Sequence, residues 1–532
     1  MQSWLSSSLV RNYPTSRAQK RRTLVLHAAR GETVSFQVCF RTEAEPQKVQ
    51  ASAESSAGLS AQVRRVGYVP FRHFSTDTPL DELDGIGHLP GLVPDPLLPG
   101  SEIISGPHAT SAFWITVRVP ADAKPGRRKV IVTLTAEKLE PVSLAATVVV
   151  HKAVAAPRRD FPVTHWFYAD ALCDWYHTEL WQESFWPLLE AYLRNLSSHY
   201  HDTTHIPAFT PPTDGVKRPT QLLGVGKQGD RYTFDWTLVK RWIKTAQAAG
   251  LTRYEWNHLF TQWGAKYAIR VYEGHGETKK LLWDPETLGV SPIYRDFLSQ
   301  YLPEFKRFLD AEGLFEASFF HLSDEPHGDE HRANYRLARQ MLREVAPWMT
   351  VMDALSQIEF AREGLTDVPI AIISETPQFV SEGFPAWTYF CCEPRRRYLN
   401  RLMDTPLVKT RMAGWLFHKT RARGFLHWGH NYWCKFGASE PLDPYQSGDG
   451  KDPELPYGDT FVVYPGEAGP VDSIRWEVWA ESLQDYALLQ AAGIDPSDAM
   501  LSEIEDYAKF PRSESWIQER RQTILAMLDR LG

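Results

Sequence analysis

The chain has 532 residues, 43% of them hydrophobic and 23% charged, and a formal net charge of −7 at pH 7. The length exceeds that of one ordinary domain, and the composition is typical of a soluble globular protein. The negative balance argues against nucleic acid as the main partner, because phosphate binding needs a basic surface, and no apolar run approaches the roughly 18 residues that suggest a membrane span.

The N-terminus, MQSWLSSSLVRNYP, shows no apolar segment typical of a signal peptide. The cysteines Cys39, Cys173, Cys391, Cys392 and Cys434 form neither a metal-binding spacing nor a disulfide framework, which favours a reducing compartment. We therefore expect a cytoplasmic protein, although a secreted form whose signal has been removed would show the same sequence. Cys391 and Cys392 are adjacent in a strand-like run, so their side chains should face opposite sides of it.

Residues 1–155 are predicted to form an N-terminal β-sandwich domain. Short segments such as TVSFQVCF (33–40), SAFWITVRV (111–119) and ATVVVHKAVA (146–155) alternate apolar and polar residues with the period of two expected of strands. Turn-forming residues separate them, for example Lys124-Pro125-Gly126. No catalytic constellation is evident, so we interpret this part as an accessory or scaffold domain.

Residues 156–532 are predicted to form an α/β domain, a (β/α)8 TIM-like barrel with closing C-terminal helices. Strand-like apolar runs alternate with amphipathic helical segments, and eight strands over roughly 270 residues match that fold in number and size. An open doubly wound sheet is the rival, but it usually carries a Gly-rich phosphate loop, which is not found. The predicted strands span residues 161–168, 201–209, 253–260, 316–325, 350–356, 368–375, 386–393 and 424–433.

Helical periodicity predicts helices between most of these strands and one after the last of them. The helical segments include residues 184–200, 237–250, 294–313, 331–347 and 473–490. We expect the segment 473–490 to close the barrel. Residues 440–470, rich in Pro, Gly and Asp, are expected to form a long loop that covers the site at this edge.

The run HLSDEPHGDEH (321–331) at the end of the fourth strand is the most informative stretch. Chemistry in such barrels takes place at the C-terminal ends of strands, where Asp324 and Glu325 lie. Adjacent carboxylates repel each other, so one proton is held more tightly, which suits a general acid near neutral pH. Pro326 biases Glu325 toward an extended backbone, on which successive side chains diverge, so two different roles on one substrate are favoured. The structural alternative is that Ser323 or Asp324 merely caps the following helix, whose dipole favours acids.

This pair favours a glycosidase with a substrate-assisted mechanism. Ordinary glycosidases place two carboxylates on opposite sides of the scissile bond, roughly 5–9 Å apart, an arrangement that adjacent residues fit poorly. In the substrate-assisted route, the 2-acetamido oxygen of the sugar attacks C1 and forms an oxazolinium-type intermediate. One carboxyl group protonates the leaving oxygen, and the other holds the acetamide N–H and stabilises its developing positive charge.

Three ordered motifs, SDEP (323–326), GFLHWGHNYW (424–433) and SIRWEVWAESLQDYALL (473–489), resemble glycoside hydrolase family 123 and its related domain of unknown function. The resemblance covers the predicted barrel and the C-terminus, and the N-terminal β-sandwich also matches the family's architecture. It implies a retaining, substrate-assisted β-N-acetylgalactosaminidase. Carried over, Glu325 would be the acid/base and Asp324 would orient the acetamide.

Polar and aromatic residues near the other strand ends are predicted to contact the sugar. One of the two tryptophans Trp428 and Trp433 would form the floor of the subsite, because sugar C–H faces pack on aromatic rings. For each position the alternative is packing, or a satisfied polar group, in the barrel core. The predicted substrate-binding residues are Trp428, Asn431, Trp433, Tyr389, Asn257, His258, Glu375 and His165.

No metal or cofactor is expected. His321, His327 and His331 lie near Asp324 and Asp329, but the HExxH and HxxEH spacings of zinc enzymes are absent from the sequence.

The predicted partner is a glycan that contains N-acetylhexosamine, with no nucleic acid and no membrane, and assembly into a homo-oligomer is left open. Two rival functions are also left open. One is a glycosidase of another sugar specificity that uses Glu325 together with Glu375, and the other is a non-catalytic carbohydrate-binding barrel.

Overall fold

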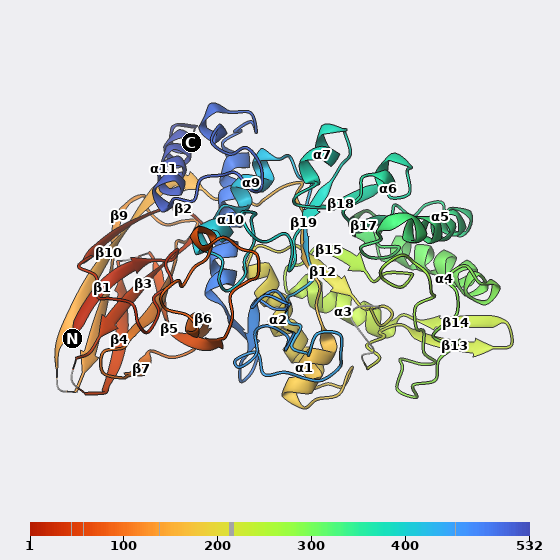
Figure 1. Cartoon of the computed structure of the whole chain (residues 1–532), viewed down its shortest axis with the longest axis horizontal. Helices are drawn as coiled ribbons and strands as arrows, with labels where there is room; N and C mark the ends of the chain where they lie inside the picture. The colour runs from red at the N-terminus through yellow and green to blue at the C-terminus, as the bar shows by residue number, and fades with distance from the viewer. Residues whose placement is uncertain (44, 57, 138, 212–217, 453, 532) are drawn as a thin grey trace.

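The computed structural model describes residues 1–531 except 44, 57, 138, 212–217 and 453. Its N-terminal part consists of two five-stranded sheets (Figure 1), in which the neighbouring strands are antiparallel except for β2 and β10. Sheet A has the order β1(Gln2–Ser7), β3(Thr33–Arg41), β8(Thr110–Arg118), β5(Ser60–Phe71), β6(Gly91–Leu98). Sheet B has the order β2(Thr23–Arg30), β10(Leu139–Val154), β9(Gly126–Ala136), β4(Gln47–Ser55), β7(Glu102–Ser105). The two sheets share one buried core, to which Phe36, Phe113 and Val132 belong.

Sheet A is buried on both faces. A period-two pattern is typical of a sheet with one face in water, yet eight of the nine residues of β8 are buried. The second face is covered by α8 (Leu407–Arg411) and α10 (Ile474–Ala491), where Trp4 and Trp114 pack with Ile474 and Val478. Helices from the distant C-terminal half therefore complete the N-terminal sheets.

A buried ion pair joins the same two parts of the chain. Nε and Nη2 of Arg475 on α10 each lie 3.0 Å from a carboxylate oxygen of Asp95 on β6, and both side chains are 0% exposed. The hydroxyl of Tyr464 also donates to Asp95, at 2.6 Å. The geometry is bidentate, so the attraction is strong and direction-dependent.

We expect Asp95→Ala to lower the free energy of unfolding by about 3 kcal/mol, because it leaves the guanidinium of Arg475 buried without its counter-charge. Urea denaturation followed by tryptophan fluorescence measures this. The matched control is Lys48→Ala, which removes an exposed ion pair with Glu102 and should leave the midpoint nearly unchanged. Equal midpoints for the two variants would contradict the prediction.

The C-terminal part contains a strand within each of the eight predicted segments, and every pairing among these strands is parallel. The strands are β11(Val163–His165), β12(Thr203–Ile206), β15(Arg253–Trp256), β16(Ser318–Phe320), β17(Met352–Leu355), β18(Val368–Ile372), β19(Trp387–Tyr389) and β20(Phe425–His427).

The closed barrel predicted from the sequence is not shown, since these strands form two separate hydrogen-bonded sheets. One sheet has the order β11-β20-β19-β18-β17 and the other has the order β12-β15-β16. A single parallel bridge, Phe320 to Val351, links them on one side, and β11 packs beside β12 on the other. With only three to five residues each, the strands are too short to sustain a continuous ladder. The α/β alternation is confirmed.

The predicted helices are confirmed within a few residues at their ends. The remaining helices are α1(Ala169–Tyr176), α2(Phe185–Ser198), α3(Thr237–Ala248), α4(Pro292–Ala311), α5(Gly328–Val345), α6(Glu359–Arg362), α7(Thr376–Ser381), α9(Ala413–Lys419) and α11(Glu514–Leu531). Two hairpins, β13(Gly224–Gln228)-β14(Arg231–Asp235) and β21(Val463–Pro465)-β22(Pro470–Asp472), and the 3-10 turns Leu80–Glu82, Phe315–Ala317 and Ala499–Leu501 complete the described elements.

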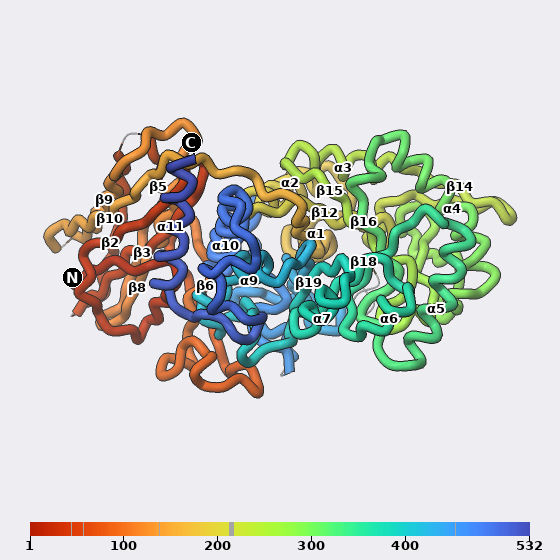
Figure 2. The backbone as a smooth tube through the Cα atoms, turned by 90° about the horizontal axis from the view of Figure 1, so that it is seen from above, coloured from red at the N-terminus to blue at the C-terminus, as the bar shows by residue number. Residues whose placement is uncertain are grey.

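Helix α10, which was expected to close the barrel, lies between the N-terminal sheets and the rest of the chain (Figure 2). Its Trp476 packs against His165 of β11, and its Trp479 packs against Phe425 of β20. It is buried on nearly all sides and packs against α8, α9, α11 and β6. Helix α11 then returns to pack on β2 and β10. No helix in the described ranges is long and apolar enough to cross a membrane.

Candidate active site

A pocket lies at the C-terminal ends of the parallel strands. Its lining includes the predicted pair Asp324 and Glu325, which follow β16, and a third acid, Asp459. Aromatic rings form much of the remaining wall: Trp166, Trp263, Tyr389, Trp428 and Phe436. The strands and their following loops therefore bring the predicted pair, a third acid and several rings to one cavity.

The two acids of the pair have different partners within the pocket. The hydroxyl of Tyr389 donates to Oε1 of Glu325 at 2.8 Å, and Nε2 of Gln262 donates to Oδ2 of Asp324 at 3.2 Å. Burial raises the pKa of Glu325, and the hydrogen bond from Tyr389 and the charge of His327 oppose this rise only in part. Glu325 is therefore suited to hold a proton for donation, which is what a general acid needs.

The backbone at Glu325 corrects one expectation. Instead of the extended conformation that Pro326 favours, Glu325 has a φ of 42°, in the left-handed region. Two backbone hydrogen bonds hold the turn: Glu325 N–H donates to the carbonyl of Ala354 at 3.0 Å, and Trp263 N–H donates to that of Asp324 at 2.8 Å. Such a conformation costs about 1–3 kcal/mol and clusters at functional sites. A turn, and not an extended strand, therefore directs both side chains into the pocket.

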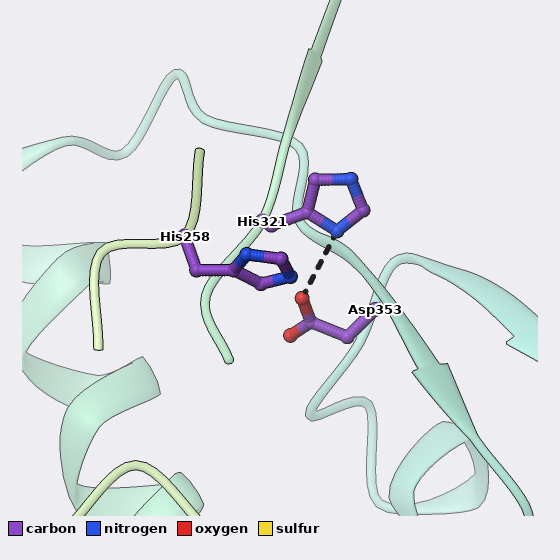
Figure 3. A group of neighbouring side chains, drawn as sticks. All are labelled: His258, His321 and Asp353. Carbon is purple, nitrogen blue, oxygen red and sulfur yellow. Dashed lines mark ion pairs between the residues drawn. The ribbon is translucent and has the colours of Figure 1, made fainter. Parts of the chain in front are cut away.

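A buried layer of polar groups supports the pair from below. The carboxylate of Asp353 accepts the backbone N–H groups of residues 322–323, at 3.0 and 3.2 Å. The ring of His321 lies between Asp353 and Glu255, with Nδ1 at 3.3 Å and Nε2 at 2.8 Å from the two carboxylates (Figure 3 draws the first contact). Burial disfavours the charged ring, but the two carboxylates outweigh it and raise the pKa of His321 to about 10.

Glu255 connects this layer with the pocket wall. It accepts Nε1–H of Trp166 at 2.8 Å and also the hydroxyl of Thr164. Burial raises the pKa of Glu255, but His321, His205 and Thr164 outweigh burial, so the net shift is downward. An ionised Glu255 therefore fixes the orientation of the Trp166 ring.

A family model described as the catalytic domain of glycoside hydrolase 123 matches residues 166–492, more than half of the chain. The chain belongs to glycoside hydrolase family 123. It is therefore a glycosidase that acts on a glycan, and the acid-lined pocket at the strand ends is where such chemistry is expected.

The chain was also compared with solved structures. A family 123 glycoside hydrolase from Clostridium perfringens, analysed for glycolipid glycan hydrolysis, is 14% identical and aligns over 99% of this chain and 97% of that chain, with a TM-score of 0.75. A family 5 xyloglucanase from Bacteroides ovatus is 9% identical over 88% of this chain and 99% of that chain, with a TM-score of only 0.29. The first likeness shows a common fold. A comparison with curated protein sequences found no match.

Two of the predicted substrate-binding residues of this family 123 enzyme line the pocket, namely Trp428 and Tyr389. Trp428 donates its Nε1–H to Oδ2 of Asp459 at 2.9 Å, which fixes its ring in the wall. The hydroxyl of Tyr389 donates to Glu325, so this residue contacts the acid pair as well as lining the cavity.

The other six lie outside the described lining of this pocket. The side-chain amide of Asn431 accepts the backbone N–H of Tyr168 at 2.9 Å and donates to the carbonyl of Tyr168 at 3.0 Å. Trp433 is buried and donates to the carbonyl of Val463 at 3.1 Å. These contacts favour the alternative of satisfied core groups.

The remaining four predicted contacts also pack away from the cavity. Asn257 accepts the N–H of Phe209 at 3.0 Å and lies next to the buried His258. His165 is buried, with Nδ1 at 2.9 Å from Nε2 of His201. Glu375 is half-buried where α7 begins. Strand-end position alone did not distinguish the pocket from the layer beneath it.

Several pocket residues were missed by the sequence reasoning, above all Asp459. It lies in the predicted loop 440–470, of which Leu455 and Asp459 line the pocket, and burial raises its pKa to about 7. Cys391 and Cys392 were expected on opposite sides of a strand, but β19 ends at Tyr389. Both cysteines therefore line the pocket, with their Sγ atoms 3.8 Å apart.

Proposed function

We propose that this family 123 enzyme releases β-linked N-acetylgalactosamine from glycans with retention of configuration, by the substrate-assisted route. The observation that carries the proposal is that Asp324 and Glu325, adjacent in sequence, open into one pocket with aromatic walls. We further propose that the eight parallel strands act as a TIM-like barrel that presents this pocket.

In this mechanism Glu325 protonates the departing glycosidic oxygen and later takes a proton from water. Its raised pKa and its contact with Tyr389 support this role. The carboxylate of Asp324 accepts the acetamide N–H of the sugar and stabilises the positive charge that develops on it. The hydrogen bond from Gln262 supports Asp324 in a fixed orientation.

The aromatic walls support a pyranose as the ligand. Trp166, Trp263 and Trp428 line the same cavity as the acids, and ring faces pack well against sugar C–H groups. The rival that pairs Glu325 with Glu375 gains no support, because Glu375 lies outside the described pocket lining.

A screen of aryl β-glycosides tests the proposal. We expect turnover of the N-acetylgalactosaminide, slower turnover of the N-acetylglucosaminide and none of the galactoside, which lacks the acetamido nucleophile. Turnover of the galactoside at a rate similar to that of the N-acetylgalactosaminide would contradict substrate assistance. Binding of glycans without turnover of any of them would favour the non-catalytic rival.

We expect Tyr389→Phe to shift the alkaline limb of the pH profile of kcat/KM to higher pH. The hydroxyl of Tyr389 stabilises the ionised form of Glu325 and thus lowers its pKa. Without this hydrogen bond, less opposes the effect of burial, so the pKa of Glu325 rises further. The protonated form of Glu325 then persists to higher pH. The control is Tyr445→Phe, whose hydroxyl donates to the carbonyl of Pro465. A Tyr389→Phe profile that coincides with the wild-type profile would contradict this assignment.

A further inference from the structure

We propose that His258, His321 and Asp353 form a binding site for one zinc ion directly beneath the acid pair. The three side chains follow or belong to the neighbouring strands β15, β16 and β17, and they converge in Figure 3. Each offers one ligand atom, and these atoms all lie within 4.8 Å of one another. The site does not depend on the proposed sugar specificity.

One ligand pair has the spacing expected around a metal ion. Nδ1 of His321 lies 3.3 Å from Oδ1 of Asp353. Ligands about 2.0–2.1 Å from a tetrahedral zinc ion are themselves about 3.3–3.4 Å apart. Both ring nitrogens of His258 are buried and form no hydrogen bond with any residue that the structure describes, whereas Nδ1 of His321 has its ion pair with Asp353.

Unpaired buried nitrogens are costly, because they have lost water without gaining a partner. A cation between the two rings would accept a lone pair from each of them. His258 is 2% exposed and His321 is 1% exposed, so bulk water does not reach them to serve instead. One ion would therefore give one ring nitrogen of His258 a partner and would join it to the His321 ring and the Asp353 carboxylate.

The surroundings of His321 and Asp353 match those of metal ligands. A metal-binding histidine donates its second ring N–H to a carboxylate, which fixes the ring and raises its basicity. Nε2 of His321 lies 2.8 Å from Oε1 of Glu255. The other oxygen of Asp353 accepts the hydroxyl of Tyr335 and, at 3.2 Å, the N–H of Ser323. Zinc would take the place of the proton on Nδ1 of His321, and that proton would pass to water.

The donor set of two imidazoles and one carboxylate favours zinc over magnesium or calcium, which prefer oxygen ligands. A second group, His199, Asp472 and Glu477, also brings its ligand atoms together. There, the guanidinium of Arg64 already contacts both carboxylates at 2.6 Å, so the negative charge is neutralised. In the first group the described contacts of Asp353 include no guanidinium, and its counter-charge is the His321 ring, whose Nδ1 proton zinc would replace.

An ion at this site would act on the acid pair through the backbone. It would cross-link the ends of three strands and fix Asp353, whose oxygens hold the N–H groups of residues 322–323, just before Asp324. His258, His321 and Asp353 are therefore positioning residues, because they do not touch the pocket.

The test measures metal content apart from activity. The full-length protein is stripped with a chelator, dialysed, and titrated with Zn²⁺ in competition with a chromophoric chelator. Co²⁺ is used in parallel, since a tetrahedral site with nitrogen ligands gives visible absorption bands. We expect one ion per chain, loss of the ion in His258→Gln, and affinity reduced about 10–100-fold in Glu255→Gln.

The matched control is His430→Gln. His430 is also fully buried, and neither of its ring nitrogens forms a hydrogen bond with any residue that the structure describes. It does not belong to the group of His258, His321 and Asp353. This variant should retain the ion. The proposal is overturned if the wild-type protein binds neither metal, or if His258→Gln binds as tightly as the wild type. If His258→Gln does not fold, the stoichiometry and the cobalt spectrum of the wild type decide. Metal bound without glycosidase activity would reject only the proposed function.

Discussion

Glu325→Gln should lower kcat/KM about 10²–10⁴-fold on a substrate with a poor leaving group, because the glutamine cannot protonate the departing oxygen. The amide has nearly the same shape as the protonated carboxyl group, so the fold and sugar binding should change little. Initial rates on a natural glycan and on an activated aryl glycoside measure the effect. The fall in kcat/KM should be smaller on the activated substrate, since its leaving group needs less protonation.

The pH profile gives this variant a second signature. In the wild type, kcat/KM should fall at alkaline pH as Glu325 loses its proton, at a pH displaced upward by burial. The pH profile of Glu325→Gln should lack this fall at alkaline pH. The matched control is Glu375→Gln, a half-buried glutamate at another strand end that is not part of the described pocket, and its rate should stay near wild type. Near-normal turnover of the natural glycan by Glu325→Gln would remove Glu325 from the acid role.

Asp324→Asn should lower kcat about 10²–10³-fold, as is typical when a preorganised group that stabilises transition-state charge is removed. The asparagine can still accept a hydrogen bond from the acetamide N–H, but it lacks the negative charge that offsets the oxazolinium. Because this charge develops only during the reaction, kcat should fall more than KM rises.

Asp459→Asn is the comparison for this variant, because it neutralises a third acid of the same pocket. Its amide oxygen can still accept Nε1–H of Trp428, so the loss of rate should be smaller than for Asp324→Asn. Progress curves on an aryl N-acetylgalactosaminide give both values. A rate for Asp324→Asn that equals the wild-type rate would argue against acetamide assistance.

The positions of the eight strands and of the acid pair could be predicted because their signals are local. Each strand is a short apolar run between helical segments, and Asp324-Glu325 directly follows one such run. The same local signal marks Asn431 and Trp433, whose side chains instead bond to the backbone of Tyr168 and Val463. Sequence position shows that a residue lies near a strand end, but it does not show whether the side chain faces the pocket or the layer below.

Amino-acid order alone thus determined the α/β alternation, the location of the acids and the membership of family 123. Tertiary packing decided that Asp459, 134 positions after Glu325, shares a cavity with it, that Glu325 adopts a left-handed backbone, and that α10 buries the outer face of sheet A. These features depend on contacts between segments that are distant along the chain. Periodicity and turn chemistry report only on the nearest neighbours of a residue, and therefore carry no record of such contacts.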